Sequence, residues 1–149
     1  MDEAARVTPI GLFNFAETYW TAAKALKRSK ARSTHRESPI RFLYYHAIEL
    51  YLKAFLRLHG HTPQELRSKK FGHRTCCLTE RAAQLGLEFD DEDVEVFSLM
   101  TTTDAIIRSR YLETGFFRWP TLEALNRTCK SLRVSVRDEL RRKGVHVRG

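Results

Sequence analysis

The sequence predicts an all-α protein, an up-and-down bundle of about five helices in a single domain over residues 1–149. Apolar residues recur at spacings of three and four along its longest segments, which is the period of a helix. A hydroxyl residue precedes proline at Thr8, Ser38 and Thr62. This pattern is typical of helix starts, because the hydroxyl accepts a free N–H and proline has none. No stretch shows strand alternation over a useful length.

Residues 39–59 are predicted to form the central helix. Apolar side chains cover nearly its whole circumference, which is typical of a helix that others pack against on several sides. Its polar residues His46, Glu49, Lys53 and Arg57 fall on one narrow stripe. These interruptions argue against a membrane span. The stripe is therefore the first place to look for a functional site.

Further helices are expected around the central one, over residues 9–28, 73–85, about 90–110 and 121–142, with one helical turn from residue 63. Gly86 is well placed to cap the C-terminus of the helix that ends near residue 85. The acids between Glu88 and Glu95 favour the positive N-terminus of the next helix. A metal site is the alternative interpretation of these acids, although no calcium-loop pattern is present. The basic tail of about residues 143–149 is expected to fray.

The charge of the chain favours a polyanionic partner. Its net charge is +8 and its pI is about 9.7, values compatible with RNA or nucleotide binding. Residues 24–36 contain six cations and no acid. The candidates for nucleic-acid contacts in this run are Lys27, Arg28, Lys30, Arg32 and Arg36. The alternative is a cationic helix C-terminus, stabilised by the helix dipole and continued into a solvated loop.

Other sequence signals indicate a cytoplasmic protein without a cofactor. The N-terminus lacks the apolar region of a signal peptide. The cysteines Cys76, Cys77 and Cys129 form no C-x-x-C pair, so reduced thiols are expected. No P-loop, G-x-S-x-G or H-E-x-x-H motif and no plausible zinc set is present. We therefore expect no metal ion and no cofactor.

Three segments resemble HEPN-domain proteins: HAIELYLKAFLRLHG, then Gly72-His73 before CCLTERAAQLG, then Arg110-Tyr111 after a long helix. The resemblance covers residues 9 to about 142. It implies a helical bundle, often a symmetric homodimer, with a link to RNA or nucleotides. It places the chain in a prokaryotic defence or toxin–antitoxin type of system.

The Arg110-Tyr111 pair looks like the Arg-Tyr-Pro variant of that family, with Leu112 in place of proline. In that variant the domain often accompanies a minimal nucleotidyltransferase. The matching positions, which the resemblance implies for ligand binding, are Glu49, Lys53, His73, Arg110 and Tyr111, with His46 beside them as a further candidate.

Many HEPN-domain proteins are metal-independent ribonucleases that carry Arg-x(4–6)-His. No histidine follows Arg110 at that spacing, which argues against catalysis. A ribonuclease would have to use Arg110 or Arg41 with His46 or His73. Arg41 and His46 lie five positions apart, so on one helix they point to different sides. A non-catalytic binding module is thus the leading expectation. A ribonuclease and a protein partner of a nucleotidyltransferase or antitoxin are the alternatives.

A carboxylate at Glu49 on a nearly all-apolar helix would be costly to bury without a partner. Arg110 is a side chain of the type that pairs with a carboxylate through two hydrogen bonds. We therefore predict an ion pair between Glu49 and Arg110, flanked by His46. Whether such a pair is structural or part of a ligand site is left open by the sequence.

Overall fold

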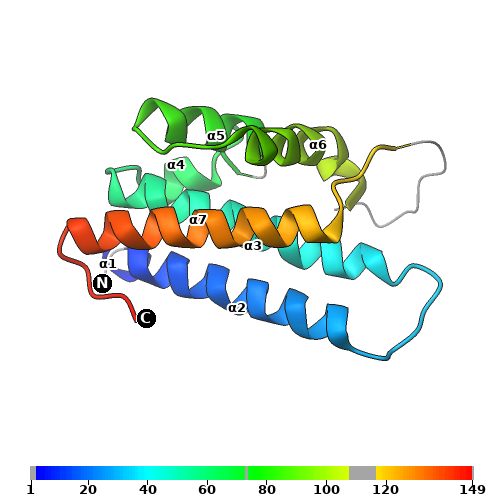
Figure 1. The fold of residues 1–149 in the computed structure, drawn as a ribbon. Coiled ribbons are helices and arrows are strands. Elements are labelled where there is room, and N and C mark those ends of the chain that lie inside the picture. The colour runs from blue at the N-terminus through cyan, green and yellow to red at the C-terminus, as the bar shows by residue number, and fades with distance from the viewer. Residues whose placement is uncertain (1–2, 73, 108–116, 149) are drawn as a thin grey trace.

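The computed structural model describes residues 3–72, 74–107 and 117–148, and over these ranges it is all-helical (Figure 1). The elements are α1 (Glu3–Arg6), α2 (Pro9–Arg28), α3 (Glu37–Leu58), α4 (Pro63–Arg67), α5 (Thr75–Gln84), α6 (Asp91–Ile107) and α7 (Leu122–Arg142). The prediction of an all-α protein is confirmed. As far as the described residues extend, none of these helices offers the apolar length that crossing a bilayer demands.

Hydroxyl caps begin three of the helices. The Thr8 side chain accepts a hydrogen bond from the Gly11 amide at 3.0 Å, and Thr121 accepts one from the Ala124 amide at 3.1 Å. Thr62 and Glu65 form a reciprocal capping box at the start of α4. At Ser38 the prediction was wrong, because α3 begins at Glu37, two residues before Pro39, and has no side-chain cap.

The end of α5 confirms the predicted role of Gly86. The Gly86 amide donates to the Ala83 carbonyl and the Leu87 amide donates to the Ala82 carbonyl, both at 3.0 Å. This is a Schellman motif, which requires a left-handed residue after the helix. Gly86 supplies it with φ +103°, a conformation that other residues rarely adopt.

Helix α3 is the centre of the bundle, as predicted. It packs against α2, α7, α5 and α6, and its side chains Tyr44, Tyr45, Tyr51 and Phe55 are almost completely buried. Helix α2 runs antiparallel to α3, whereas α7 lies beside α3 and runs in the same direction (Figure 1). A helix covered on this many sides needs apolar residues around its circumference, and the sequence provides them.

Polar side chains that are wholly or partly buried join α3 to both of its long neighbours. The Glu17 carboxylate of α2 accepts the Tyr51 hydroxyl at 2.6 Å and Arg133 Nε of α7 at 2.7 Å. Burial, reinforced by the Glu17 carboxylate, raises the pKa of Tyr51. A second contact joins α2 to α7: Asn126 Oδ1 of α7 accepts a hydrogen bond from Trp20 Nε1 of α2 at 2.9 Å. Each hydrogen bond satisfies a polar group that burial would otherwise leave unpaired.

Helix α6 is fixed by buried hydroxyl groups of its neighbours. Asp93 accepts the Thr128 hydroxyl at 2.8 Å and the Ser131 hydroxyl at 3.0 Å, both from α7. Burial raises the pKa of Asp93, although these hydrogen bonds work in the opposite direction. Tyr45 of α3 shares a hydrogen bond of 2.8 Å with Thr103. These contacts place α6 against both α3 and α7.

The tail after α7 was expected to fray, but Val145 and Val147 within it pack against the core. Val147 is only 6% exposed and belongs to the core. Its carbonyl accepts a hydrogen bond from Arg141 Nη2 at 2.9 Å. A buried valine and a paired backbone carbonyl both hold this segment in place, and the basic composition of the tail did not indicate either of them.

Glu17→Ala should lower the free energy of unfolding by about 2–3 kcal/mol, because it removes two hydrogen bonds to a carboxylate and leaves the Tyr51 hydroxyl buried without its acceptor. Urea unfolding followed by circular dichroism measures this loss. Glu80→Ala on the exposed side of α5 is the matched control and should stay within about 0.5 kcal/mol of the parent protein. Equal losses in the two variants would contradict the role assigned to Glu17.

Candidate functional site

The polar stripe of α3 is partly buried in the bundle. Glu49 is 1% exposed, whereas His46 and Lys53 are half-buried. The three side chains come from successive turns of one helix, so they lie on the same side of it. The predicted grouping of these three residues is therefore compatible with the backbone of α3. A carboxylate as deeply buried as Glu49 must be compensated by charge or hydrogen bonds.

Four aromatic rings form a continuous ladder across α2 and α3. The Tyr19 ring meets the His46 ring edge-on, with centroids 4.4 Å apart. Phe15 packs edge-on against Tyr19 at 6.1 Å, and Phe42 stacks on His46 at 5.9 Å. We call Phe15, Tyr19, His46 and Phe42 the aromatic ladder. Phe15 is 59% and Phe42 38% exposed, so its two ends reach the surface.

The surface of α2 next to this ladder carries no formal charge. Between residues 9 and 23, the exposed positions of α2 are Gly11, Asn14, Phe15, Thr18, Thr21 and Ala22. Charged residues make up 30% of the whole chain, so an uncharged face of about three helical turns is a departure from the rest of the surface. We call these six residues the uncharged face. Phe15 is the large apolar side chain of this face, and exposed apolar area bordered by polar residues is typical of interaction sites.

The predicted nucleic-acid contacts between Lys27 and Arg36 separate into two groups. Arg36 Nη2 donates to the carbonyls of Leu26, at 3.3 Å, and Ser29, at 3.1 Å, and so caps the C-terminus of α2. Lys27 Nζ lies 3.3 Å from Glu123 of α7. These two cations therefore have structural partners, which the sequence could not show.

The remaining three residues of that prediction, Arg28, Lys30 and Arg32, are exposed. Within the described ranges, none of the three has a hydrogen bond or an ion pair to another side chain. They lie at the end of α2 and in the loop that leads to α3 (Figure 1). Of the predicted basic run, these are the cations whose charge is fully available to a polyanion.

Arg41 and His46 point toward different helices. Arg41 Nε donates to the Pro120 carbonyl, at the entrance of α7, at 3.3 Å, and its guanidinium lies 5.4 Å from the Trp119 ring centroid. His46 contacts Tyr19 on α2 instead. The two side chains therefore do not converge on one substrate. The other members of the predicted site, His73, Arg110 and Tyr111, lie outside the described residues, and the Glu49–Arg110 pair stays a prediction.

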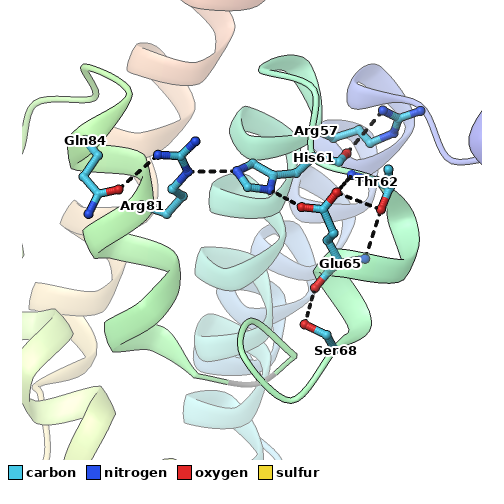
Figure 2. A network of polar contacts seen from close by, with 7 residues as sticks. All are labelled: Arg57, His61, Thr62, Glu65, Ser68, Arg81 and Gln84. Atoms are coloured by element: carbon cyan, nitrogen blue, oxygen red, sulfur yellow. Dashed lines mark hydrogen bonds and ion pairs between the residues drawn. The ribbon is translucent and has the colours of Figure 1, made fainter.

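A polar network that the sequence analysis missed surrounds His61, after the end of α3 (Figure 2). His61 Nε2 faces Arg81 Nε at 3.0 Å, and Nδ1 faces Glu65 Oε2 at 2.8 Å. Because Arg81 can only donate, Nε2 accepts, which leaves the imidazole proton on Nδ1 to be donated to Glu65. The hydrogen bond from His61 holds the pKa of Glu65 below its usual value.

This network connects α5 to the α3–α4 turn. Both ring nitrogens of His61 are occupied by protein groups, so the imidazole serves as a link and not as a base for a substrate. The backbone carbonyl of His61 also accepts Arg57 Nη1 at 3.3 Å. The signal that could have identified the network is the run H-T-P-Q-E, in which the capping-box glutamate lies four positions after a histidine.

The acidic run before α6 has a structural role. Asp90 Oδ1 accepts the Asp93 amide at 2.8 Å, which caps the first turn of the helix. Asp91 and Glu92 follow within that turn, where carboxylates favour the helix dipole. Across the described part of the chain, no group of three or more histidine, cysteine or acidic residues is arranged to hold a metal ion.

A double-mutant cycle on Glu49→Gln and Arg110→Gln tests the predicted ion pair. Removing either partner of a buried pair should cost about 3 kcal/mol of unfolding free energy, and the two losses should fall short of additivity by about 1 kcal/mol or more. Urea unfolding measures all four proteins. Arg118→Gln, which changes an exposed arginine that pairs with Glu95, is the control and should be additive with Glu49→Gln. Additivity of Glu49→Gln with Arg110→Gln would show that the two side chains are not paired.

A scan against protein-family models finds no match to this chain, and searches of curated proteins and of solved structures find none. The resemblance to HEPN-domain proteins therefore rests on the sequence segments that carry it, and a functional assignment depends on the surfaces of the chain itself.

Proposed function

We propose that this chain is a HEPN-like, non-catalytic module that binds single-stranded RNA or a nucleotide through the loop between α2 and α3. The observation that carries the proposal is the exposure of Arg28, Lys30 and Arg32 in a segment without any acid from residue 18 to residue 36. Cations that lack a carboxylate partner keep their full charge for phosphate groups. Each phosphate that they neutralise releases counterions, and this release drives association.

The position of these cations also suits a polyanion. Their loop projects beyond the end of the bundle in Figure 1, so an extended strand can approach it without meeting the body of the protein. The net charge of +8 adds a long-range attraction for polyanions. The ribonuclease alternative is less well supported, because Arg41 and His46 face different neighbours. A binding function requires no such convergence.

The variant Arg28→Ala/Lys30→Ala/Arg32→Ala tests this proposal. If three phosphates are neutralised, the slope of log K against log salt concentration should become less negative by about 2. Fluorescence anisotropy with a labelled single-stranded RNA, measured from low to moderate salt in the presence of EDTA, gives both affinity and slope. Gel electrophoresis of the same samples should show intact RNA, and cleavage would favour the ribonuclease alternative.

The matched control is Lys69→Ala/Lys143→Ala/Arg148→Ala, which removes the same charge from exposed positions outside this loop. It should weaken binding much less and leave the salt slope nearly unchanged. Equal losses in the two triple variants would mean that only net charge matters. The absence of any RNA or nucleotide binding at low salt would overturn the proposal.

A second candidate function, self-association, is favoured by the uncharged face and the aromatic ladder. Two copies that each carry +8 repel one another, and they meet with least repulsion where the surface has no charge. The exposed rings of Phe15 and Phe42 supply apolar area at that place. A single patch that meets its own copy produces a two-fold symmetric dimer. A nucleotidyltransferase or antitoxin partner is the alternative occupant, and it would leave the purified chain monomeric.

Phe15→Ser/Phe42→Ser should raise the dimer dissociation constant by about a hundredfold, because buried aromatic anchors each contribute roughly 1–2 kcal/mol or more to an interface. Sedimentation velocity over a concentration series measures the constant. Val94→Ser is the control, since Val94 is 53% exposed but lies on α6, away from this surface. A parent protein that sediments as a monomer at all concentrations would contradict self-association.

A further inference from the structure

The loop between α2 and α3 borders an open pocket of about 570 Å³. A volume in this range accommodates a small ligand of the size of a mononucleotide. Its wall combines the cations Lys27, Arg36 and Arg41 with His35 and the hydroxyl groups of Ser33 and Ser38. Arg28, Lys30 and Arg32, the exposed cations of the same region, do not line it. The pocket is therefore distinct from the exposed basic surface beside it.

Two of the pocket's guanidinium groups are held by backbone carbonyls. Arg36 Nη2 donates to the Leu26 and Ser29 carbonyls, and Arg41 Nε donates to the Pro120 carbonyl. These contacts orient the side chains but leave their positive charge, because a carbonyl is a neutral acceptor. Arginines held in this way lose little further conformational freedom when they bind an anion.

The charge within the lining is positive. Among the lining residues, Lys27, Arg36 and Arg41 contribute three positive charges and Glu37 one negative charge, which gives +2 with histidine taken as neutral. Glu123, outside the lining, lies 3.3 Å from Lys27 Nζ and offsets part of this charge. Glu37 Oε1 lies 3.3 Å from Arg41 Nη2, so this carboxylate already occupies one side of that guanidinium. The first turn of α3 adjoins the pocket without a side-chain cap, and its positive dipole end adds to the attraction for anions.

We propose that this pocket binds a phosphate monoester, either of a free mononucleotide or at the 5′ end of an RNA strand. This inference rests on the proposed binding of RNA or nucleotide, and it assigns one phosphate group of that ligand to a specific place. Arg36 and Arg41 supply the fixed charges, Lys27 a further one that it shares with Glu123, and Ser33 and Ser38 hydroxyl donors. A dianionic terminal phosphate is attracted to these cations more strongly than a monoanionic diester is.

The discriminating experiment compares two RNA strands that differ only in a 5′-phosphate or a 5′-hydroxyl. The parent protein should bind the phosphorylated strand about tenfold more tightly, in keeping with the strength of charge-assisted hydrogen bonds. In Lys27→Gln/Arg41→Gln this preference should disappear, while affinity for the hydroxyl strand falls only slightly. Glu37→Gln should increase the preference, because it removes the competing carboxylate.

The matched control is Lys30→Gln/Arg32→Gln, which removes two charges from the same loop outside the pocket. It should weaken both strands by the same factor and keep their ratio. A parent ratio of one, or a ratio that falls equally in the control and in the pocket variant, would overturn the pocket assignment. RNA binding would survive either result, so the proposed function and the pocket can fail separately.

A nuclear magnetic resonance titration of the parent protein with adenosine monophosphate tests the pocket without RNA and without any variant that could fail to fold. The amide signals of residues 33–38 should shift in a saturable way, and adenosine should produce no such shift. Saturation by the mononucleotide would identify a free nucleotide as a ligand source, whereas a preference seen only with RNA would indicate a 5′ end. Shifts that match those caused by an equal concentration of chloride, together with a strand ratio of one, would rule out a phosphate site.

Discussion

The structure depends on the burial of α3 on several sides. Tyr44 and Tyr51, two turns apart, project from one side of this helix and Tyr45 from another, and all three are almost completely buried. Each tyrosine adds a large apolar ring, but each also carries a hydroxyl that must find a partner away from water. The partners of Tyr45 and Tyr51 are Thr103 on α6 and Glu17 on α2. The apolar rings drive the association of the helices, and the hydroxyl groups determine which positions face one another.

One consequence concerns α2, the neighbour of α3 whose inward side is held in place by hydrogen bonds. Helix α2 is held by Glu17 and Trp20 near its middle, on its inward side. Its outward side is then divided into the uncharged face at residues 11–22 and the basic end beyond residue 24. One helix thus presents two surfaces of different chemistry. The self-association and the polyanion binding that we propose would therefore use different residues of α2.

Arginine illustrates why charge alone is a weak guide to function. Arg36 caps α2, Arg133 bonds to Glu17, and Arg81 donates to His61. In each case the guanidinium donates a hydrogen bond to an acceptor that would otherwise be unpaired: a backbone carbonyl, a carboxylate or an imidazole. These hydrogen bonds leave the charges in place but fix where the guanidinium groups point, so a net charge of +8 does not say which cations face a ligand. For anion binding, the useful distinction is between cations bonded to a neutral partner, such as a carbonyl, and cations whose charge a carboxylate offsets.

The sequence by itself determined the all-α class, the extent of α2 and the central position of α3, because these follow from periodicity, caps and hydrophobic pattern within each segment. It also determined the Schellman turn at Gly86, since a left-handed turn residue is a local requirement. Only the tertiary structure decided that Arg36 is a cap, that Val147 joins the core and that Phe15 and His46 belong to one ladder. These outcomes depend on which segments meet in space, and a pattern confined to one segment does not contain that information.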